Sequence, residues 1–366
     1  MATHRYKACL FVFIVLTVTV KYVVWLSPSA MRLLTSVYVT VVGAVTSRPD
    51  QTHITVCSSY AITENRSAAS DLITAPPEKP EVDKSGRYVS ICEPNLDHRR
   101  TGNQLLSLAA MLHVARLTGR RVAMVWSHPY GWLDRWFRVP VTRVDNITEL
   151  CPCVTVSETA ALTYSPQISL LSNRTDIAGK SILVCGYFQS WKYTVGVESA
   201  LRYHLRLLPN VSAAIHDYLN QIRPPAWKRQ SFSRIGIHAR AGDIMRRRHC
   251  RFGFTIPQRP YFERAMARFV DERRQRGGGR VQFIVTSDRL AWVKRAFNFT
   301  SIAQRLNRTS SSTKDKVVVE VAHSEGHDAG FDLGLLSLCD GVIMSTGSYG
   351  WWAAWLANKT TIYYSN

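Results

Sequence analysis

Acidic residues are scarce in this chain of 366 residues, in which 26 Asp and Glu stand against 46 Lys and Arg, giving a formal net charge of +20. A basic surface of this size favours an anionic partner, such as nucleic acid, phosphate, an acidic glycan or a membrane surface. The sequence contains neither G-x-G-x-x-G nor G-x-x-x-x-G-K-S/T, which excludes the dinucleotide fingerprint and the P-loop. It also lacks an Asp-x-Asp pair of the kind that holds a metal against a sugar nucleotide. We therefore expect neither a metal nor a cofactor.

One long apolar run, residues 8–26, is about as long as a bilayer-spanning helix needs to be. Arg5 and Lys7 precede it and favour a cytosolic N-terminus. A cleaved signal peptide is the alternative, but no convincing small-x-small cleavage site follows the run. We predict a cytosolic tail over 1–7, a signal-anchor transmembrane helix over 8–26 and an extended luminal stem over 27–86, rich in Ser, Thr and Pro towards its end.

Sequons and cysteines agree with a luminal body. Asn-x-Ser/Thr acceptors for N-glycosylation lie on both sides of the midpoint, at Asn65, Asn146, Asn173, Asn210, Asn298, Asn307 and Asn358. The cysteines after the stem form an even set: Cys92, Cys151, Cys153, Cys185, Cys250 and Cys339. In an oxidising compartment such a set favours structural disulfides, although the sequence does not choose the pairing. A luminal location argues against nucleic acid as the partner.

Apolar runs alternate with helical patterns in the last third of the chain. Strands are predicted over 235–239, 281–287, 316–321, 341–346 and 360–364, with helices over 261–274, 290–297, 331–338 and 349–356. This alternation predicts a parallel sheet covered by helices on both faces. An earlier region has predicted strands at 87–93, 121–126 and 181–191, and a long helix over 99–119, and a Pro-Pro segment follows it. We therefore predict an α/β protein with one lobe over 87–228 and another over 229–366.

Polar residues cluster where the predicted strands of the second lobe end. They are His238, Arg240, Gly242 and Asp243 after the first strand, Thr286, Ser287 and Asp288 after the second, and Ser345, Thr346, Gly347 and Ser348 after the fourth. Ligands of parallel sheets bind beyond these strand ends. A Ser/Thr/Gly turn entering a helix offers N–H groups and hydroxyls to an anion, and a nearby arginine can bind phosphate oxygens with two donors. The cluster predicts a nucleotide-diphosphate site in which Arg240 stabilises the leaving group.

Structural roles compete with this interpretation. Arg240 could form a buried ion pair with Asp243. Asp288 and Ser348 each stand where an N-cap of the following helix is expected. The run Arg246–Arg248 could be a solvated basic loop.

Five blocks occur in one order between Arg100 and Ala357: "RTGNQLLSLAAMLHVARLTGRRVAMV", "CGYFQSWKY", "IGIHARAGD", "FIVTSDRLAWVK" and "FDLGLLSLCDGVIMSTGSYGWWAAWLA". Together they resemble the galactoside α-1,2-fucosyltransferases. The resemblance implies a GT-B-like fold of two Rossmann-like lobes with the donor cleft between them, the first lobe on the acceptor side and the second binding the nucleotide sugar. It implies metal-independent, inverting transfer of L-fucose from GDP-fucose to the 2-hydroxyl of a terminal β-galactose on glycoprotein or glycolipid glycans. The tail, span and stem resemble a single-pass type II enzyme of the Golgi membrane.

The resemblance also implies roles for individual residues. Arg240 matches the arginine that grips the GDP diphosphate, His238 a residue near the nucleoside, and Asp332 an acidic residue that recognises guanine through N1–H and N2–H. Gly347 and Ser348, preceded by Ser345 and Thr346, match the turn that contacts phosphate, and Gly102 and Asn103 match a first-lobe loop that faces the donor. Asp243 is our candidate for the catalytic base, and His128 is a weaker one. Aromatic residues in "WSHPYGW" (126–132) and "GYFQSW" (186–191) are candidates to stack on the acceptor sugar.

Two positions depart from the family pattern. Ala241 stands where a second arginine is usual, and Thr101 stands where an apolar residue is usual. Arg246, Arg247 and Arg248 are candidates to replace the missing cation. Three alternatives stay open: a fucosyltransferase of another linkage, a non-catalytic Golgi protein that binds GDP-sugar or glycan, and a basic luminal protein whose binding of acidic glycans depends steeply on salt. Ala241 is the feature that favours the second of these.

Overall fold

The computed structural model describes residues 54–57, 87–92, 100–125, 133–139, 142–144, 146–228, 230–245, 255–308 and 316–365. All of these lie in one compact unit, His53–Asn366. The predicted tail and signal anchor lie outside the described residues. Within the described ranges, no helix combines the length and apolar character needed to cross a membrane.

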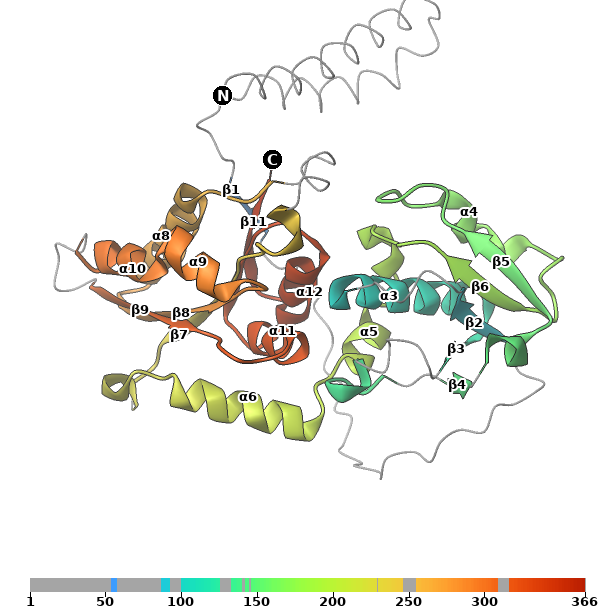
Figure 1. Cartoon of the computed structure of the whole chain (residues 1–366), viewed down its shortest axis with the longest axis horizontal. Coiled ribbons are helices and arrows are strands. Elements are labelled where there is room, and N and C mark those ends of the chain that lie inside the picture. The colour runs from blue at the N-terminus through green and yellow to red at the C-terminus, as the bar shows by residue number, and fades with distance from the viewer. Residues whose placement is uncertain are drawn as a thin grey trace, which may run out of the picture. The chain divides into compact units, whose positions relative to one another are not determined.

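The second lobe contains a six-stranded sheet in the order β1-β11-β10-β7-β8-β9 (Figure 1). Its parallel strands are β7 (Ser233–His238), β8 (Gly279–Thr286), β9 (Val317–His323), β10 (Gly341–Met344) and β11 (Thr360–Tyr364). The helices of this lobe are α8 (Arg259–Gln275), α9 (Leu290–Phe297), α10 (Phe299–Arg308), α11 (Ala329–Ser337) and α12 (Ser348–Ala357), with the short η8 (Asp243–Met245) after β7. The predicted alternation is confirmed. Helix α10 was not predicted; it begins directly after Asn298, whose φ of 46° ends α9.

Strand β1 (Ile54–Cys57) lies inside the predicted stem. It pairs antiparallel with β11, with Ile54 opposite Tyr364 and Cys57 opposite Thr361. Its sequence, Ile-Thr-Val-Cys, is rich in β-branched residues, which suit a sheet edge. Part of the region that we predicted to be an extended stem therefore adds a strand to the sheet of the second lobe.

The first lobe contains a parallel five-stranded sheet in the order β4-β3-β2-β6-β5. Its strands are β2 (Tyr88–Ile91), β3 (Arg121–Val125), β4 (Thr142–Val144), β5 (Cys153–Ser157) and β6 (Ser181–Cys185). Its helices are α3 (Thr101–Thr118), η4 (Ile147–Leu150), α4 (Pro166–Ser169), η5 (Leu171–Asn173), η6 (Trp191–Thr194) and α5 (Glu198–His204). Next along the chain come α6 (Pro209–Gln221) and η7 (Pro225–Trp227), and α6 packs on the second lobe, with Ile215 against Ile284 of β8 and Leu335 of α11 (Figure 1). β4 and β5 were not predicted, because three to five residues carry too little periodicity. Two parallel α/β sheets agree with the predicted GT-B-like fold.

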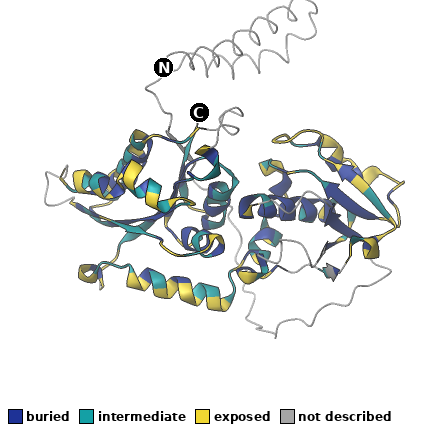
Figure 2. Ribbon diagram, viewed as in Figure 1, coloured by how far each residue is buried: buried dark blue, intermediate teal, exposed yellow. Residues whose placement is uncertain are grey.

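One continuous apolar cluster of described residues spans the two lobes. It contains Leu105 and Met111 of α3 together with Leu336 of α11 and Trp352 of α12, all with essentially no exposed surface. Figure 2 shows the buried character of α3 and of the helices of the second lobe that it meets. Burying each such side chain contributes about 1.5–3 kcal/mol. The cluster therefore holds the start of α3 beside the start of α12.

The cysteines only partly follow the prediction. Disulfides join Cys92 to Cys185 and Cys151 to Cys153. Cys339 is a free, buried thiol whose Sγ donates to the Leu335 carbonyl oxygen at 3.4 Å. The expectation that Cys339 is paired is wrong, because it follows α11 among apolar side chains with no cysteine of the described residues beside it. Cys250 lies outside the described residues.

Candidate functional site

Three neighbouring strands of the six-stranded sheet end at the same level. His238 at the end of β7 pairs with Thr286 on β8 and with Met344 on β10. The polar residues that follow these strands therefore meet at one edge of the sheet. The structure brings together the second-lobe residues that the sequence placed at strand ends.

Arg240 stands at the N-terminus of helix α12. Its backbone N–H donates to Ser345 Oγ at 2.8 Å, and its guanidinium pairs with Asp243 at 3.0 Å, so the anticipated ion pair is present. The guanidinium lies against Gly347, where an added Cβ would be 2.1 Å from Nη1 of Arg240. Gly347 is the N-cap of α12 with φ 106° and ψ 160°. A permanent cation beside a helix N-terminus attracts an anion for two independent reasons.

The start of α3 meets this turn from the first lobe. Ser348 Oγ donates to Asn103 Oδ1 at 3.0 Å, and Gln189 Nε2 donates to the same oxygen at 2.9 Å. An added Cβ at Gly102 would be 2.6 Å from Tyr349 N, so only glycine permits this approach. Gly102 and Asn103 therefore lie directly against the turn that begins α12. The capping role considered for Ser348 is wrong, because Gly347 is the N-cap.

Asp288 does not cap α9, whose N-cap residue is Arg289 without a side-chain bond. Instead Asp288 Oδ1 accepts from the N–H groups of Ala241 at 2.8 Å and Gly242 at 2.9 Å. The capping interpretation is wrong because the carboxylate turns back towards β7. Ala241 is fully buried in the apolar core of the second-lobe sheet, so its side chain does not face the site. The proposed substitutes Arg246, Arg247 and Arg248 lie outside the described residues.

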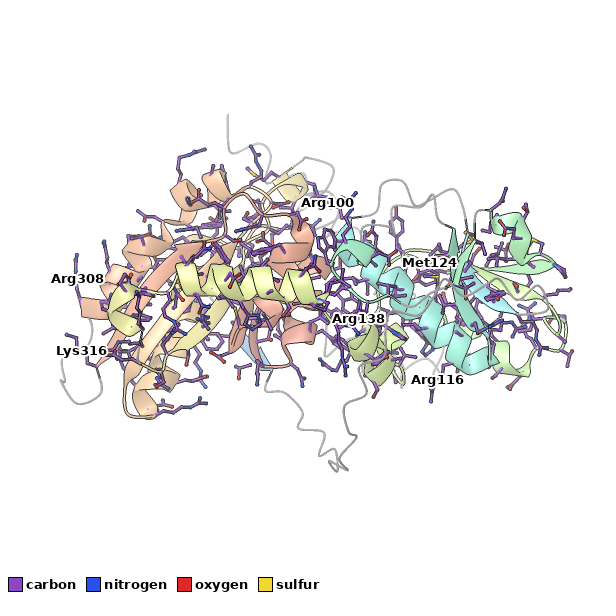
Figure 3. The ribbon with its side chains drawn as sticks, turned by 90° about the horizontal axis from the view of Figure 1, so that it is seen from below. Arg100, Arg116, Met124, Arg138, Arg308 and Lys316 are labelled. Atoms are coloured by element: carbon purple, nitrogen blue, oxygen red, sulfur yellow. A yellow bond between two sulfur atoms is a disulfide. The ribbon has the colours of Figure 1, made fainter. Side chains whose placement is uncertain are left out.

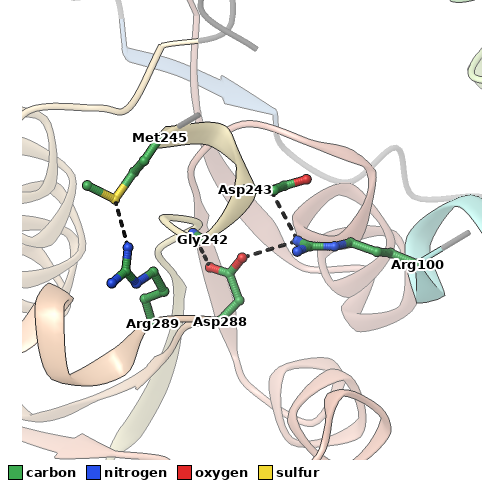
Figure 4. Close-up of a pocket in the computed structure, with 6 residues that line it drawn as sticks. All are labelled: Arg100, Gly242, Asp243, Met245, Asp288 and Arg289. Carbon is green, nitrogen blue, oxygen red and sulfur yellow. Dashed lines mark hydrogen bonds and ion pairs between the residues drawn. The ribbon is translucent and has the colours of Figure 1, made fainter. Parts of the chain in front are cut away.

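Arg100, from the first lobe, bridges the two carboxylates. Its Nη1 lies 3.1 Å from Asp243 Oδ1 and 3.2 Å from Asp288 Oδ2 (Figure 4). Figure 3 shows Arg100 where the two lobes meet. The cavity beside this network has a volume of about 530 Å³ and is lined by Arg100, Gly242, Asp243, Met245, Asp288 and Arg289.

His238, the last residue of β7, is buried next to the Ser345–Ser348 turn. Burial lowers its pKa to about 4, so the imidazole is neutral at physiological pH. Its ring packs on the Tyr349 ring, with the centroids 4.8 Å apart. The Tyr349 hydroxyl donates to the Ala329 carbonyl oxygen at 2.6 Å. Tyr349 therefore connects the end of β7 with the start of α11.

Asp332 lies in the first turn of α11. Burial raises its pKa to about 7, and Ser324 Oγ donates to its Oδ1 at 2.5 Å. The rings of His327 and Phe331 stack beside this region, with centroids 4.0 Å apart and an interplanar angle of 11°. A carboxylate near aromatic rings is chemically suited to a purine base, which offers N–H donors at its edge and a π face.

Sequence reasoning missed Asp328 and Trp136. Asp328 caps α11 by accepting from the Gly330 and Phe331 N–H groups, and its Oδ2 accepts from Trp136 Nε1 of the first lobe at 3.1 Å. An Asp directly before the helical "AGFDLGLL" is an N-cap signal that could have found Asp328. No local signal points to Trp136, whose partner is 192 residues away.

The remaining predicted residues give less information about the site. Thr346 Oγ1 donates to the Thr255 carbonyl oxygen at 3.5 Å. The segment 126–132, with His128, and the sequon Asn65 lie outside the described residues.

Asn307 uses both ends of its side-chain amide on edge strand β9, donating to Val319 O at 3.0 Å and accepting from Val319 N at 2.8 Å. In the described ranges, no three His, Cys, Asp or Glu side chains lie together as metal ligands would.

Comparison with known proteins supports the resemblance seen in the sequence. The family model described as glycosyl transferase family 11 matches residues 170–366. The chain is 24% identical over 267 residues to Bos taurus galactoside 2-alpha-L-fucosyltransferase SEC1, covering 73% of this chain and 65% of the relative. It is 28% identical over 269 residues to Mus musculus galactoside alpha-(1,2)-fucosyltransferase 2, covering 73% of this chain and 69% of the relative. The chain therefore spans about two thirds of the length of these relatives.

Solved structures show more distant similarity. A mutant of Arabidopsis thaliana FUT1 in complex with GDP aligns with a TM-score of 0.47 and 16% identity, over 78% of this chain and 72% of that one. POFUT1 in complex with GDP-fucose aligns with a TM-score of 0.49 and 11% identity, over 78% of this chain and 99% of that one.

Proposed function

Because the chain belongs to glycosyl transferase family 11, we propose that it transfers L-fucose from GDP-fucose to the 2-hydroxyl of a terminal β-galactose, with inversion and without a required metal. The observation that carries this proposal is the placement of the Arg240 guanidinium against Gly347, at the start of α12. A departing diphosphate needs positive potential, and a fixed guanidinium beside free helix N–H groups supplies it. The names of the relatives, galactoside α-1,2-fucosyltransferases, support fucose as the transferred sugar.

In this proposal the donor lies along the edge of the second-lobe sheet. The diphosphate binds Arg240 and the turn Ser345–Ser348, the nucleoside lies near His238 and Tyr349, and guanine is recognised by Asp332. Neutral His238 suits a position beside the nucleoside, because it adds no charge that would compete with Arg240 for phosphate. Gly102 and Asn103 close the site from the first lobe.

The reaction exchanges one bond to the anomeric carbon of fucose for another. The acceptor oxygen forms a bond to C1 from the face opposite GDP, while the bond from C1 to the β-phosphate oxygen breaks and GDP leaves with the electron pair. The acceptor proton passes to a base, for which Asp243 is our candidate. Its Oδ1 pairs with Arg100 and its carboxylate also pairs with Arg240, so it must give up an ion pair to take this proton.

The acceptor side is assigned to the loop 186–191 of the first lobe. Glu158 Oε2 accepts from the Tyr187 and Phe188 N–H groups at 2.9 and 3.0 Å, and Phe188 is fully buried with φ 53°. A left-handed backbone conformation at a buried aromatic residue costs free energy, and such strained positions often occur in functional loops. The loop leaves Tyr187 and Trp191 47% and 61% exposed and directs Gln189 to Asn103. Exposed aromatic rings near the donor turn suit a sugar acceptor.

We also propose that the protein is a Golgi membrane enzyme with a luminal body, anchored by residues 8–26. The Cys92–Cys185 disulfide supports an oxidising compartment.

The test uses the full chain, purified in detergent, with labelled GDP-fucose, EDTA and a panel of β-galactosides, beside Arg240→Ala and Arg240→Lys. We expect EDTA-resistant transfer to the galactose 2-hydroxyl, a fall of about 10²–10³-fold in kcat for Arg240→Ala, and partial activity for Arg240→Lys, which keeps the charge but not the forked donors. Transfer to another hydroxyl would support a fucosyltransferase of different linkage. Tight GDP binding without transfer to any acceptor would support a non-catalytic protein instead.

A further inference from the structure

We propose that Asp288 is a positioning residue that aims Arg240 at the donor diphosphate; this inference rests on the proposed fucosyl transfer. Arg240 lies in the turn that follows β7, and the direction of its side chain depends on where that turn is held. Asp288 lies after the neighbouring strand β8 and is only partly exposed, at 29% of its side-chain surface.

Three successive N–H groups of the turn are bound by side chains from the two flanking strands. The Arg240 N–H donates to Ser345 Oγ after β10, while the N–H groups of Ala241 and Gly242 both donate to Asp288 Oδ1 after β8. An added Cβ at Gly242 would lie 2.3 Å from Asp288 Oδ2, so the carboxylate is in close contact with the turn. The turn is thus clamped from both sides, and Asp288 supplies two of the three hydrogen bonds.

The second oxygen of Asp288 connects the turn to the other lobe. Oδ2 accepts from Arg100, which also pairs with Asp243 Oδ1, and Asp243 in turn pairs with Arg240. Removing Asp288 therefore releases the turn and also frees Arg100 from one of its two carboxylates. An amide at this position would keep an oxygen for the two N–H groups but would lose the ion pair with Arg100.

Helix stability does not explain this carboxylate. The N-cap of α9 is Arg289, and the Asp288 side chain makes no capping bond to that helix. The chain offers a matched control in Asp340, whose Oδ2 accepts from the Arg234 N–H at 2.9 Å. This contact joins a carboxylate to a backbone N–H of the same strand, β7, but at the end remote from Arg240.

The experiment compares Asp288→Ala, Asp288→Asn and Asp340→Ala in the full chain, with steady-state kinetics against GDP-fucose and a β-galactoside and with thermal melting. We expect Asp288→Ala to lower kcat/KM for GDP-fucose by about 100-fold, the usual cost of misplacing a reacting group by an ångström. Asp288→Asn should recover to within about tenfold of the wild type, because the hydrogen bonds remain and the charge assistance is lost. KM for the acceptor should stay within about twofold, and Asp340→Ala should keep wild-type kinetics whatever its Tm.

Equal losses of activity in Asp288→Ala and Asp340→Ala, in proportion to their losses of Tm, would show a merely structural role and overturn the inference. Calorimetric titration with GDP separates this inference from the proposed function. If the wild type transfers no fucose but binds GDP, and Asp288→Ala alone weakens that binding at least tenfold, the positioning role stands and the proposed transfer fails. Unchanged GDP affinity and unchanged kcat in Asp288→Ala would refute the positioning role.

Discussion

Gly347→Ala adds a single methyl group to the turn that we propose faces the donor. Gly347 has φ 106° and ψ 160°, a region essentially restricted to glycine, so a side chain there costs about 1–3 kcal/mol. For a chain of 366 residues each kcal/mol lowers Tm by about 1–2 °C, because the entropy of unfolding is about 0.8 kcal/mol/K. The new Cβ would also lie 2.1 Å from Nη1 of Arg240, so the guanidinium must withdraw by about 1 Å or more. A displacement of that size costs about 100-fold in rate.

Gly119→Ala is the matched control. Gly119 also has positive φ, 63°, but an added Cβ would meet no atom within 4 Å, and the residue ends α3 away from the site. We expect it to lose about 1–2 kcal/mol of stability with unchanged kcat. The assay is initial-rate fucosyl transfer at saturating GDP-fucose together with differential scanning calorimetry. If Gly347→Ala keeps kcat within threefold of Gly119→Ala, the placement of Arg240 against the turn does not control the reaction.

Three further predictions concern the base-recognition, modification and acceptor sites. We propose that ionised Asp332 recognises guanine, and burial raises the pKa of this carboxyl to about 7, so GDP affinity should rise from pH 6 to 8 and level off above. A flat calorimetric profile, or an unchanged one in Asp332→Asn, would contradict this. Asn307 should carry no glycan, because both ends of its side-chain amide form hydrogen bonds with the edge strand, whereas the exposed Asn210 should be modified. Peptide mapping after glycosidase treatment in heavy-oxygen water measures the occupancy of both sites, and a modified Asn307 would refute the reasoning. Trp191→Ala should raise the acceptor KM about five- to tenfold without changing the KM for GDP-fucose, and an equal effect of Leu170→Ala, another exposed apolar residue, would argue against a specific contact.

Local pattern was enough to predict much of the second lobe. β7, β8, β9 and β10 and the helices α8, α9, α11 and α12 follow from apolar runs that alternate with helical periodicity, because burial on both faces of a parallel sheet selects such runs. The sites at strand ends follow from the same pattern, since parallel strands share one carboxyl edge. Elements of a few residues, such as β4, and an edge strand within a polar segment, such as β1, were beyond this reasoning.

The sequence by itself therefore determined the order of strands and helices in the second lobe and the membership of a family. It also marked Arg240 and the glycine turn before α12 as candidate site residues. Each of these depends on residues that are neighbours in the sequence. The tertiary structure alone decided the partners. Asp288 binds the backbone of the Arg240 turn and does not cap a helix, Ala241 is buried in the core, and Cys339 is a free thiol. Arg100 and Trp136 contact carboxylates that lie 188 and 192 residues away in the sequence. Such contacts depend on strand register and on the packing of α3 against α12, and no local pattern of residues encodes either.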